Sequence, residues 1–116
     1  MAASYDITID QGATFSFTFT FKDANDDRVD LTDYAAKMQI REYHSSASPV
    51  LTLTTEDDSI ELGGVLGTVK ITMSAEVTRD IFIDSGVYDI ELYSPIFTTI
   101  RMLQGKITIS PEVTRD

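Results

Sequence analysis

Apolar and polar residues alternate along most of the chain with a period of two. The clearest run contains Phe15, Phe17, Phe19 and Phe21, which alternate with serine and threonine. In a β-strand such alternation gives each face one set of side chains, whereas a helix would distribute the four rings around its circumference. The run therefore predicts a strand with one buried aromatic face, which we expect to form the floor of the core.

The same alternation recurs in shorter segments along the rest of the chain. Residues of one parity are apolar in 5–9, 36–40, 51–53, 60–62, 69–73, 88–92 and 107–109. Turn-forming residues separate these segments. Because each segment has one polar face, we expect antiparallel sheets. The spacing predicts an all-β, two-sheet antiparallel sandwich of about seven to nine strands, in a single domain over residues 1–116.

Two segments interrupt the alternation. In residues 74–80, Ser74 is placed like a helix N-cap and an acidic residue follows, which predicts one short helical turn that crosses between the sheets. Between Ile100 and Ile109 the apolar positions change parity. A β-bulge near residues 103–105 would return both apolar sets to the core.

The composition narrows the classes of function. The chain has 19 Asp and Glu against 9 Lys and Arg, a net charge of −10, which repels nucleic-acid phosphates and anionic lipid. We therefore expect neither nucleic acid nor membrane as a partner. The sequence has no cysteine, no apolar run long enough to span a membrane and no signal-peptide pattern at its start, so we expect a soluble domain that is made in a reducing compartment.

Few residues carry candidate chemistry. His44 is the only histidine and so the sole candidate for a hydrolytic triad, but no nucleophile motif accompanies it. Asp23, Asn25 and Asp27 have the spacing of early calcium-loop ligands, but the rest of that loop motif is missing, and an ordinary turn uses the same residues. The acids of residues 56–58 are also expected in a solvated turn. We predict a protein that is not an enzyme and has no catalytic residue, cofactor or metal site.

Large apolar residues in the loops are the candidate partner contacts. A monomer rarely exposes such side chains at loop tips. They either cover the ends of the sandwich or dock a neighbouring molecule, and the candidates are Val65, Leu66, Phe82, Ile83, Ile96 and Phe97. The chain ends, residues 1–5 and 111–116, are expected to be flexible or to bind partners.

The segment 84–90 resembles strand F of immunoglobulin-type sandwiches. Tyr88 takes the place of that family's tyrosine, and Ile90 takes the place of its cysteine. Met38 would fill the space that the family's tryptophan occupies. The resemblance implies an immunoglobulin-like sandwich in which the Tyr88 hydroxyl bonds the nearby backbone to fix a corner.

A second resemblance covers nearly the whole chain. It rests on the order of short motifs in residues 6–12, 22–23, 29–34, 38–41, 86–92 and 103–112. In this order the chain resembles small virion proteins of tailed bacteriophages and is similar to the N-terminal domain of siphophage upper-baseplate proteins. The resemblance implies a non-enzymatic structural component of the tail, baseplate or fibre collar, located in the virion, that assembles with copies of itself and with other virion proteins.

A different class of function is also open. The chain is alternatively a carbohydrate- or receptor-binding module for host recognition. Sugar sites generally use exposed aromatic side chains with polar neighbours. The candidates are Tyr43, which is beside His44, and Tyr93, while the absence of tryptophan disfavours this alternative.

Overall fold

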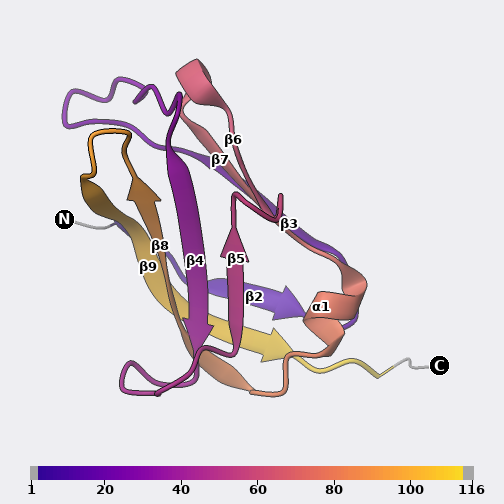
Figure 1. The fold of residues 1–116 in the computed structure, drawn as a ribbon. Coiled ribbons are helices and arrows are strands. Elements are labelled where there is room, and N and C mark those ends of the chain that lie inside the picture. The colour runs from indigo at the N-terminus through magenta and orange to yellow at the C-terminus, as the bar shows by residue number, and fades with distance from the viewer. Residues whose placement is uncertain (1–2, 114–116) are drawn as a thin grey trace.

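The computed structural model describes residues 3–113 (Figure 1). This part of the chain contains nine strands, one 3-10 turn and one short helix. Their bounds are β1 (Ala3–Ser4), β2 (Ile7–Asp10), β3 (Phe15–Thr20), β4 (Ala35–Arg41), β5 (Leu51–Thr54), β6 (Ile60–Leu62), η1 (Gly64–Leu66), β7 (Thr68–Met73), α1 (Ala75–Arg79), β8 (Ser85–Tyr93) and β9 (Thr99–Ser110).

The strands form two sheets that pack into a sandwich, as the alternation predicts. The six-stranded sheet has the order β1-β9-β8-β4-β5, and β2 also pairs with β9. The three-stranded sheet has the order β3-β7-β6. Apolar side chains from the inner faces of both sheets form one core, in which Ile9, Ile40, Ile90 and Ile107 are fully buried. The expected all-β sandwich is confirmed.

The expectation that all pairing is antiparallel is wrong at one edge. β1 and β2 both run parallel to β9, with Ile7 opposite Ile107 and Ile9 opposite Ile109. A hairpin would force neighbouring strands to alternate in direction, but β2 leads into β3 of the other sheet, so no hairpin constrains it. The first and last long strands therefore lie side by side (Figure 1).

The four phenylalanines do not form the floor of the core. Phe15, Phe17, Phe19 and Phe21 are only half-buried and pack against the rim of the core. The reason is the position of β3, which lies at the edge of the smaller sheet and has β7 as its only strand partner among the described residues. The rings are therefore covered from one side only.

The helical turn that the sequence predicts is present as α1. The Ser74 hydroxyl accepts a hydrogen bond from the Val77 backbone N–H at 3.2 Å, as an N-cap does. The turn leads from β7 of one sheet to β8 of the other. Among the described residues, no helix is long and apolar enough to cross a membrane.

The predicted bulge in β9 is also confirmed, although it begins one residue earlier than expected. Ile90 of β8 pairs with Leu103, whereas the next residue, Glu91, pairs with Arg101. Met102 is therefore the extra residue, and the bulge turns both Met102 and Leu103 into the core.

The described parts of the chain ends contact the sandwich through hydrogen bonds and an ion pair, and the expectation that the ends are flexible or bind partners stays a prediction. The Tyr5 backbone N–H donates to the Gln104 carbonyl oxygen at 2.9 Å. At the other end, Glu112 pairs with Arg79 at 3.2 Å, and its backbone N–H donates to the Gln11 side chain. Residues 1–2 and 114–116, which belong to the same expectation, lie outside the described residues.

Tyr88 also differs from the corner that the resemblance implies. Its hydroxyl donates to the carbonyl oxygen of Tyr5, which lies 83 positions away in the sequence rather than nearby. Tyr88 is opposite Gly105 in the β8–β9 ladder, and a side chain at Gly105 would collide with the Tyr5 carbonyl. The missing side chain lets the start of the chain approach β9 closely, so Tyr88 attaches β1 to the larger sheet.

Candidate functional site

Four of the six predicted contact residues lie at the same end of the sandwich. Val65 and Leu66 are in η1, between β6 and β7. Ile96 and Phe97 are in the turn between β8 and β9. The Leu31 backbone N–H donates to the Gly64 carbonyl oxygen at 2.9 Å, and the strand that follows Leu31, β4, starts beside the end of β8. Both turns are therefore at the upper end of Figure 1.

These four side chains are exposed in the described structure. Phe97 is the extreme case, with 97% of its surface accessible, followed by Ile96 with 80% and Val65 with 70%. Phe97 also has a φ of 64°, a left-handed conformation that bulky L-residues rarely adopt. The turn holds it there: the Phe97 N–H donates to the Ser94 carbonyl oxygen, and the Ser94 hydroxyl accepts from the Thr98 N–H at 3.0 Å.

The other two predicted residues do not join this end. Phe82 is 80% exposed, but it lies between α1 and β8, at the opposite end of the sandwich. Ile83 is wrong as a contact residue, because it is 5% exposed and packs in the core next to Gly86. The segment is extended, so Ile81 and Ile83 face inward while Phe82 faces outward. The alternation expected for an extended segment could have predicted from the sequence that Ile83 and Phe82 face opposite ways.

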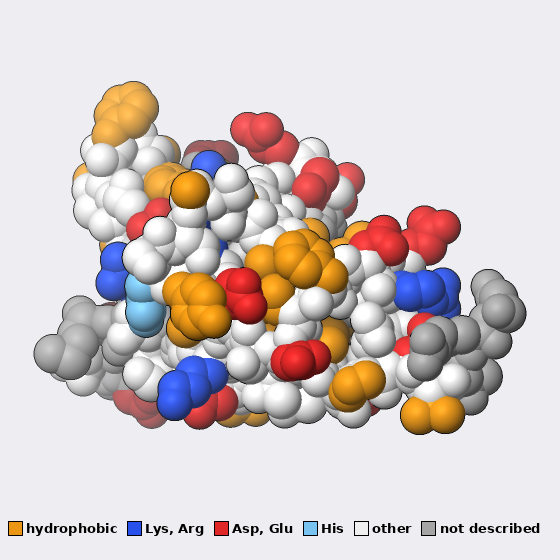
Figure 2. All heavy atoms as spheres, turned by 90° about the horizontal axis from the view of Figure 1, so that it is seen from below, with side chains coloured by type: hydrophobic (Ala, Val, Ile, Leu, Met, Phe, Trp, Pro, Cys, Tyr) orange, Lys and Arg blue, Asp and Glu red, His pale blue; other side chains and the backbone are white. Residues whose placement is uncertain are grey.

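Figure 2 views the molecule from below, toward the end that is opposite η1. On this face, hydrophobic side chains occur in small separate groups, and acidic side chains lie between and around them. Apolar residues that are scattered in this way are common on soluble proteins. Phe82 lies between α1 and β8 and is therefore separated from the four residues of the upper end.

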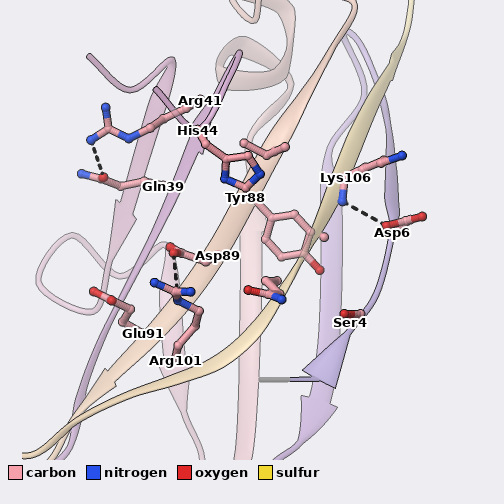
Figure 3. A pocket seen from close by; sticks show the side chains of 13 residues that line it. Ser4, Asp6, Gln39, Arg41, His44, Tyr88, Asp89, Glu91, Arg101 and Lys106 are labelled. Carbon is pink, nitrogen blue, oxygen red and sulfur yellow. Dashed lines mark hydrogen bonds and ion pairs between the residues drawn. The ribbon is translucent and has the colours of Figure 1, made fainter. Parts of the chain in front are cut away.

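A polar hollow of about 590 Å³ lies on the outer face of the larger sheet (Figure 3). The acidic, basic and histidine side chains on its walls are Asp6, Arg41, His44, Asp89, Glu91, Arg101 and Lys106. Arg41, Asp89 and Glu91 come from the neighbouring strands β4 and β8. They all point to the outer face because they alternate with buried residues along these strands. The sequence analysis did not predict this hollow. The only indication in the sequence is that polar residues occupy alternate positions of these strands.

Several polar groups of the hollow already bind one another. Arg41 donates to the Gln39 side chain at 3.0 Å and to the Ser46 carbonyl oxygen at 2.7 Å. Asp89 forms an ion pair with Arg101 at 3.5 Å (Figure 3). Partial burial raises the pKa of the Asp89 carboxyl, the Glu91 charge raises it further, and Arg101 opposes both effects. The hollow is a polar recess whose walls carry both cationic and anionic side chains.

The acidic turns fold as the sequence predicts. The Asp23 carboxylate accepts the backbone N–H groups of Asn25 at 2.9 Å and Asp27 at 3.0 Å, so these residues build a turn. Asp57 accepts from Ser59 in the same way, and these bonds lower the pKa of its carboxyl. Within residues 3–113 no cluster of three or more acidic or histidine side chains is arranged to hold a metal ion. His44 is exposed in the loop after β4.

Comparison with known proteins supports the fold. No protein-family model matches the chain, and no curated protein matches it in sequence. Among solved structures, the extracellular domain of the voltage-gated sodium channel beta4 subunit is similar, with a TM-score of 0.52 and 13% sequence identity. The match covers 97% of this chain and 96% of that one. The protein is therefore an all-β, immunoglobulin-like sandwich.

Proposed function

We propose that the chain is a non-enzymatic structural component of a tailed-bacteriophage particle, in the tail, baseplate or fibre collar. It acts by assembly with copies of itself and with other virion proteins. The observation that carries the proposal is the apolar end of the sandwich, which we define as Val65, Leu66, Ile96 and Phe97. The order of short motifs that resembles tailed-phage virion proteins directs the proposal to this kind of particle.

The apolar end is suited to docking because its exposed side chains have no cover within the described chain. Large apolar side chains that are exposed at one end of a domain often mark an interaction site. Phe97 adds to this argument, because glycine would fit its left-handed position with less strain. An exposed aromatic ring in such a position is consistent with a residue retained for contact rather than for folding.

Self-association has a parallel in the same fold. The sodium channel beta4 domains form parallel homodimers that are linked to cell–cell adhesion. An immunoglobulin-like sandwich thus supports contacts between copies in that protein, and this supports the homo-oligomeric part of the proposal.

The proposal is tested with purified particles of a tailed phage that encodes the chain. Mass spectrometry should detect the chain at a fixed number of copies per particle, and antibodies against it should label the tail or collar in electron micrographs. A double variant, Ile96→Ser with Phe97→Ser, should no longer enter particles. The control, Phe82→Ser, removes an equally exposed apolar residue at the other end and should enter normally. Absence of the chain from purified particles would refute the proposal.

The polar hollow favours the second candidate function, binding of a carbohydrate or receptor. Gln39, Asp89, Glu91 and Gln104 place amide and carboxylate groups at its walls, and such groups hydrogen bond to sugar hydroxyls. Of the aromatic candidates, Tyr43 is exposed in the loop that also carries His44, whereas the Tyr93 hydroxyl binds Glu91 at 3.0 Å. A glycan array decides: binding that Gln104→Ala abolishes would favour this function.

A further inference from the structure

The edge of β3 differs from the other sheet edges of the molecule. Residues 13–21 contain no charged residue, no proline and no glycine, although the whole chain carries a net charge of −10. The edge formed by β1 and β2 contains Asp6 and Asp10, and β6 contains Glu61. β5 has four residues against six in β3, and lies between Pro49 and Glu56. Natural proteins usually protect a long strand edge with charges, proline or a bulge, and β3 has none of these.

The register shows which backbone groups of β3 face outward. The Phe21 N–H donates to the Gly67 carbonyl oxygen at 2.8 Å, so odd-numbered residues of this strand face β7. In an antiparallel ladder the alternate residues direct both their N–H and C=O groups away from the partner. The backbone groups of Ser16, Thr18 and Thr20 therefore point to the open edge, where no other described strand pairs with them.

The sequence of this edge reads nearly the same in both directions around Thr18. Phe17 and Phe19 flank it, then Ser16 and Thr20, then Phe15 and Phe21. Two copies of β3 in antiparallel orientation, centred on Thr18, would place every phenylalanine opposite a phenylalanine and every hydroxyl opposite a hydroxyl. Aromatic pairs and hydroxyl pairs are both favourable across strands.

Half-exposed aromatic rings continue along this edge. Tyr5 is 50% exposed and lies 5.2 Å from Phe17 between ring centroids, and Phe17 lies 5.4 Å from Phe19. A second copy would cover these rings in addition to completing the ladder. Because residues 13–21 carry no charge, this edge also lets two acidic molecules approach with less repulsion than a charged face would.

We propose that β3 pairs antiparallel with β3 of a second copy of this chain. The pairing is centred on Thr18 and joins the two three-stranded sheets into one six-stranded sheet across a two-fold axis. Thr18 exchanges two hydrogen bonds with its equivalent, and Ser16 does the same with Thr20 of the other copy. This contact deepens the proposed function, because it names one of the self-contacts in the assembly.

Sedimentation velocity over a range of concentrations tests the pairing. The native chain should reach about twice its 12.9 kDa mass. Thr18→Pro removes an outward N–H and no bond to β7, so it should fold and raise the dimer dissociation constant at least tenfold. Thr18→Lys should do the same by adding a charge to the edge. Thr18→Val and Thr52→Lys, a threonine of the β5 edge, are controls that should leave the dimer unchanged.

Circular dichroism establishes whether each variant is folded. If Thr18→Pro does not fold, the test rests on Thr18→Lys. A native chain that stays monomeric at hundreds of micromolar would overturn the inference. A dimer that both folded Thr18 variants leave intact, but that Phe97→Ser dissociates, would overturn it as well, because the contact would then lie at the apolar end.

Cysteine cross-linking tests the register, since the chain contains no native cysteine. Thr18→Cys places the two thiols opposite each other, at a Cα separation of about 5.5 Å that a disulfide can bridge. Thr20→Cys places them four residues apart along the strand, roughly 13 Å. Mild air oxidation should therefore cross-link Thr18→Cys at least tenfold faster than Thr20→Cys. Equal rates would contradict the register.

The inference and the proposed function fail in different ways. If the native chain is monomeric but is present in purified particles, the β3 pairing is wrong and the structural role stands. If the chain dimerises through Thr18 but is absent from particles, the pairing stands and the particle role is wrong.

Discussion

A central strand of the larger sheet, β8, and an edge strand of the smaller sheet, β3, bury their inward side chains to different depths. In the larger sheet, β8 has neighbours on both sides and its inward residues Ile90 and Leu92 have no exposed surface. In the smaller sheet, β3 has a neighbour on one side only, and its phenylalanines are half-buried. The alternation of apolar and polar residues is regular in both strands, so alternation alone does not determine how deeply an inward side chain is buried.

What differs is the position of the strand in its sheet. A central strand receives cover from two neighbours and from the opposite sheet, whereas an edge strand leaves one flank open. We therefore expect the larger side chains on β3 to contribute less to stability than the smaller ones on β8. The same opening gives β3 a flank on which a partner can add.

The largest expected effect compares the two strands directly. Ile90→Ala should lower the free energy of unfolding by about 3–4 kcal/mol, because it leaves a cavity in the closed core. Phe17→Ala should lower it by only about 1–2 kcal/mol, because water already reaches part of the ring. Urea denaturation followed by circular dichroism measures both in a Thr18→Lys background, which removes any dimer. Equal losses would show that the ring of Phe17 is buried in the monomer.

A smaller effect is expected at the attachment of β1 to the larger sheet. Tyr88→Phe removes the hydroxyl that donates to the Tyr5 carbonyl and should cost about 1 kcal/mol. Hydrogen exchange should show faster exchange at the Tyr5 N–H, which binds Gln104, with little change in β7. Tyr34→Phe, a change on another half-buried tyrosine, is the control. Unaltered exchange at Tyr5 would mean that β1 does not depend on this bond.

The smallest effect concerns the outer face of the larger sheet. Because the pKa of the Asp89 carboxyl is raised, the folded state retains this proton to higher pH than the unfolded state does. The native chain should therefore lose stability relative to Asp89→Asn as the pH rises above 3.8, the ordinary value, and through the raised pKa. Thermal melts of the two proteins across the acid range measure the difference. A constant difference at every pH would contradict the shift.

Strand positions and the short helix could be predicted from the sequence, because alternation and capping act between near neighbours. Ser74 is one example, and the parity change that revealed the bulge at Met102 is another. The parallel pairing of β2 with β9 could not be predicted, because no residue near Ile7 indicates which distant strand will lie beside it.

The candidate site was predictable to a similar extent. Exposure of Val65, Leu66, Ile96 and Phe97 follows from their positions in turns, and the burial of Ile83 follows from an extended period of two. The polar hollow required the order of the strands, since it gathers side chains of β4, β8 and β9 that lie far apart in the sequence.

The pairing of the first strands with the last has a consequence for biosynthesis. The Asp6 carboxylate accepts a hydrogen bond from the Lys106 backbone N–H across 100 positions of the chain, so this contact cannot form until Lys106 has been synthesised. Long-range contacts of this kind slow folding. Until β9 emerges, the uncharged residues 13–21 remain without the finished sandwich around them, and nascent chains on the same messenger that meet at this stage are at risk of premature association.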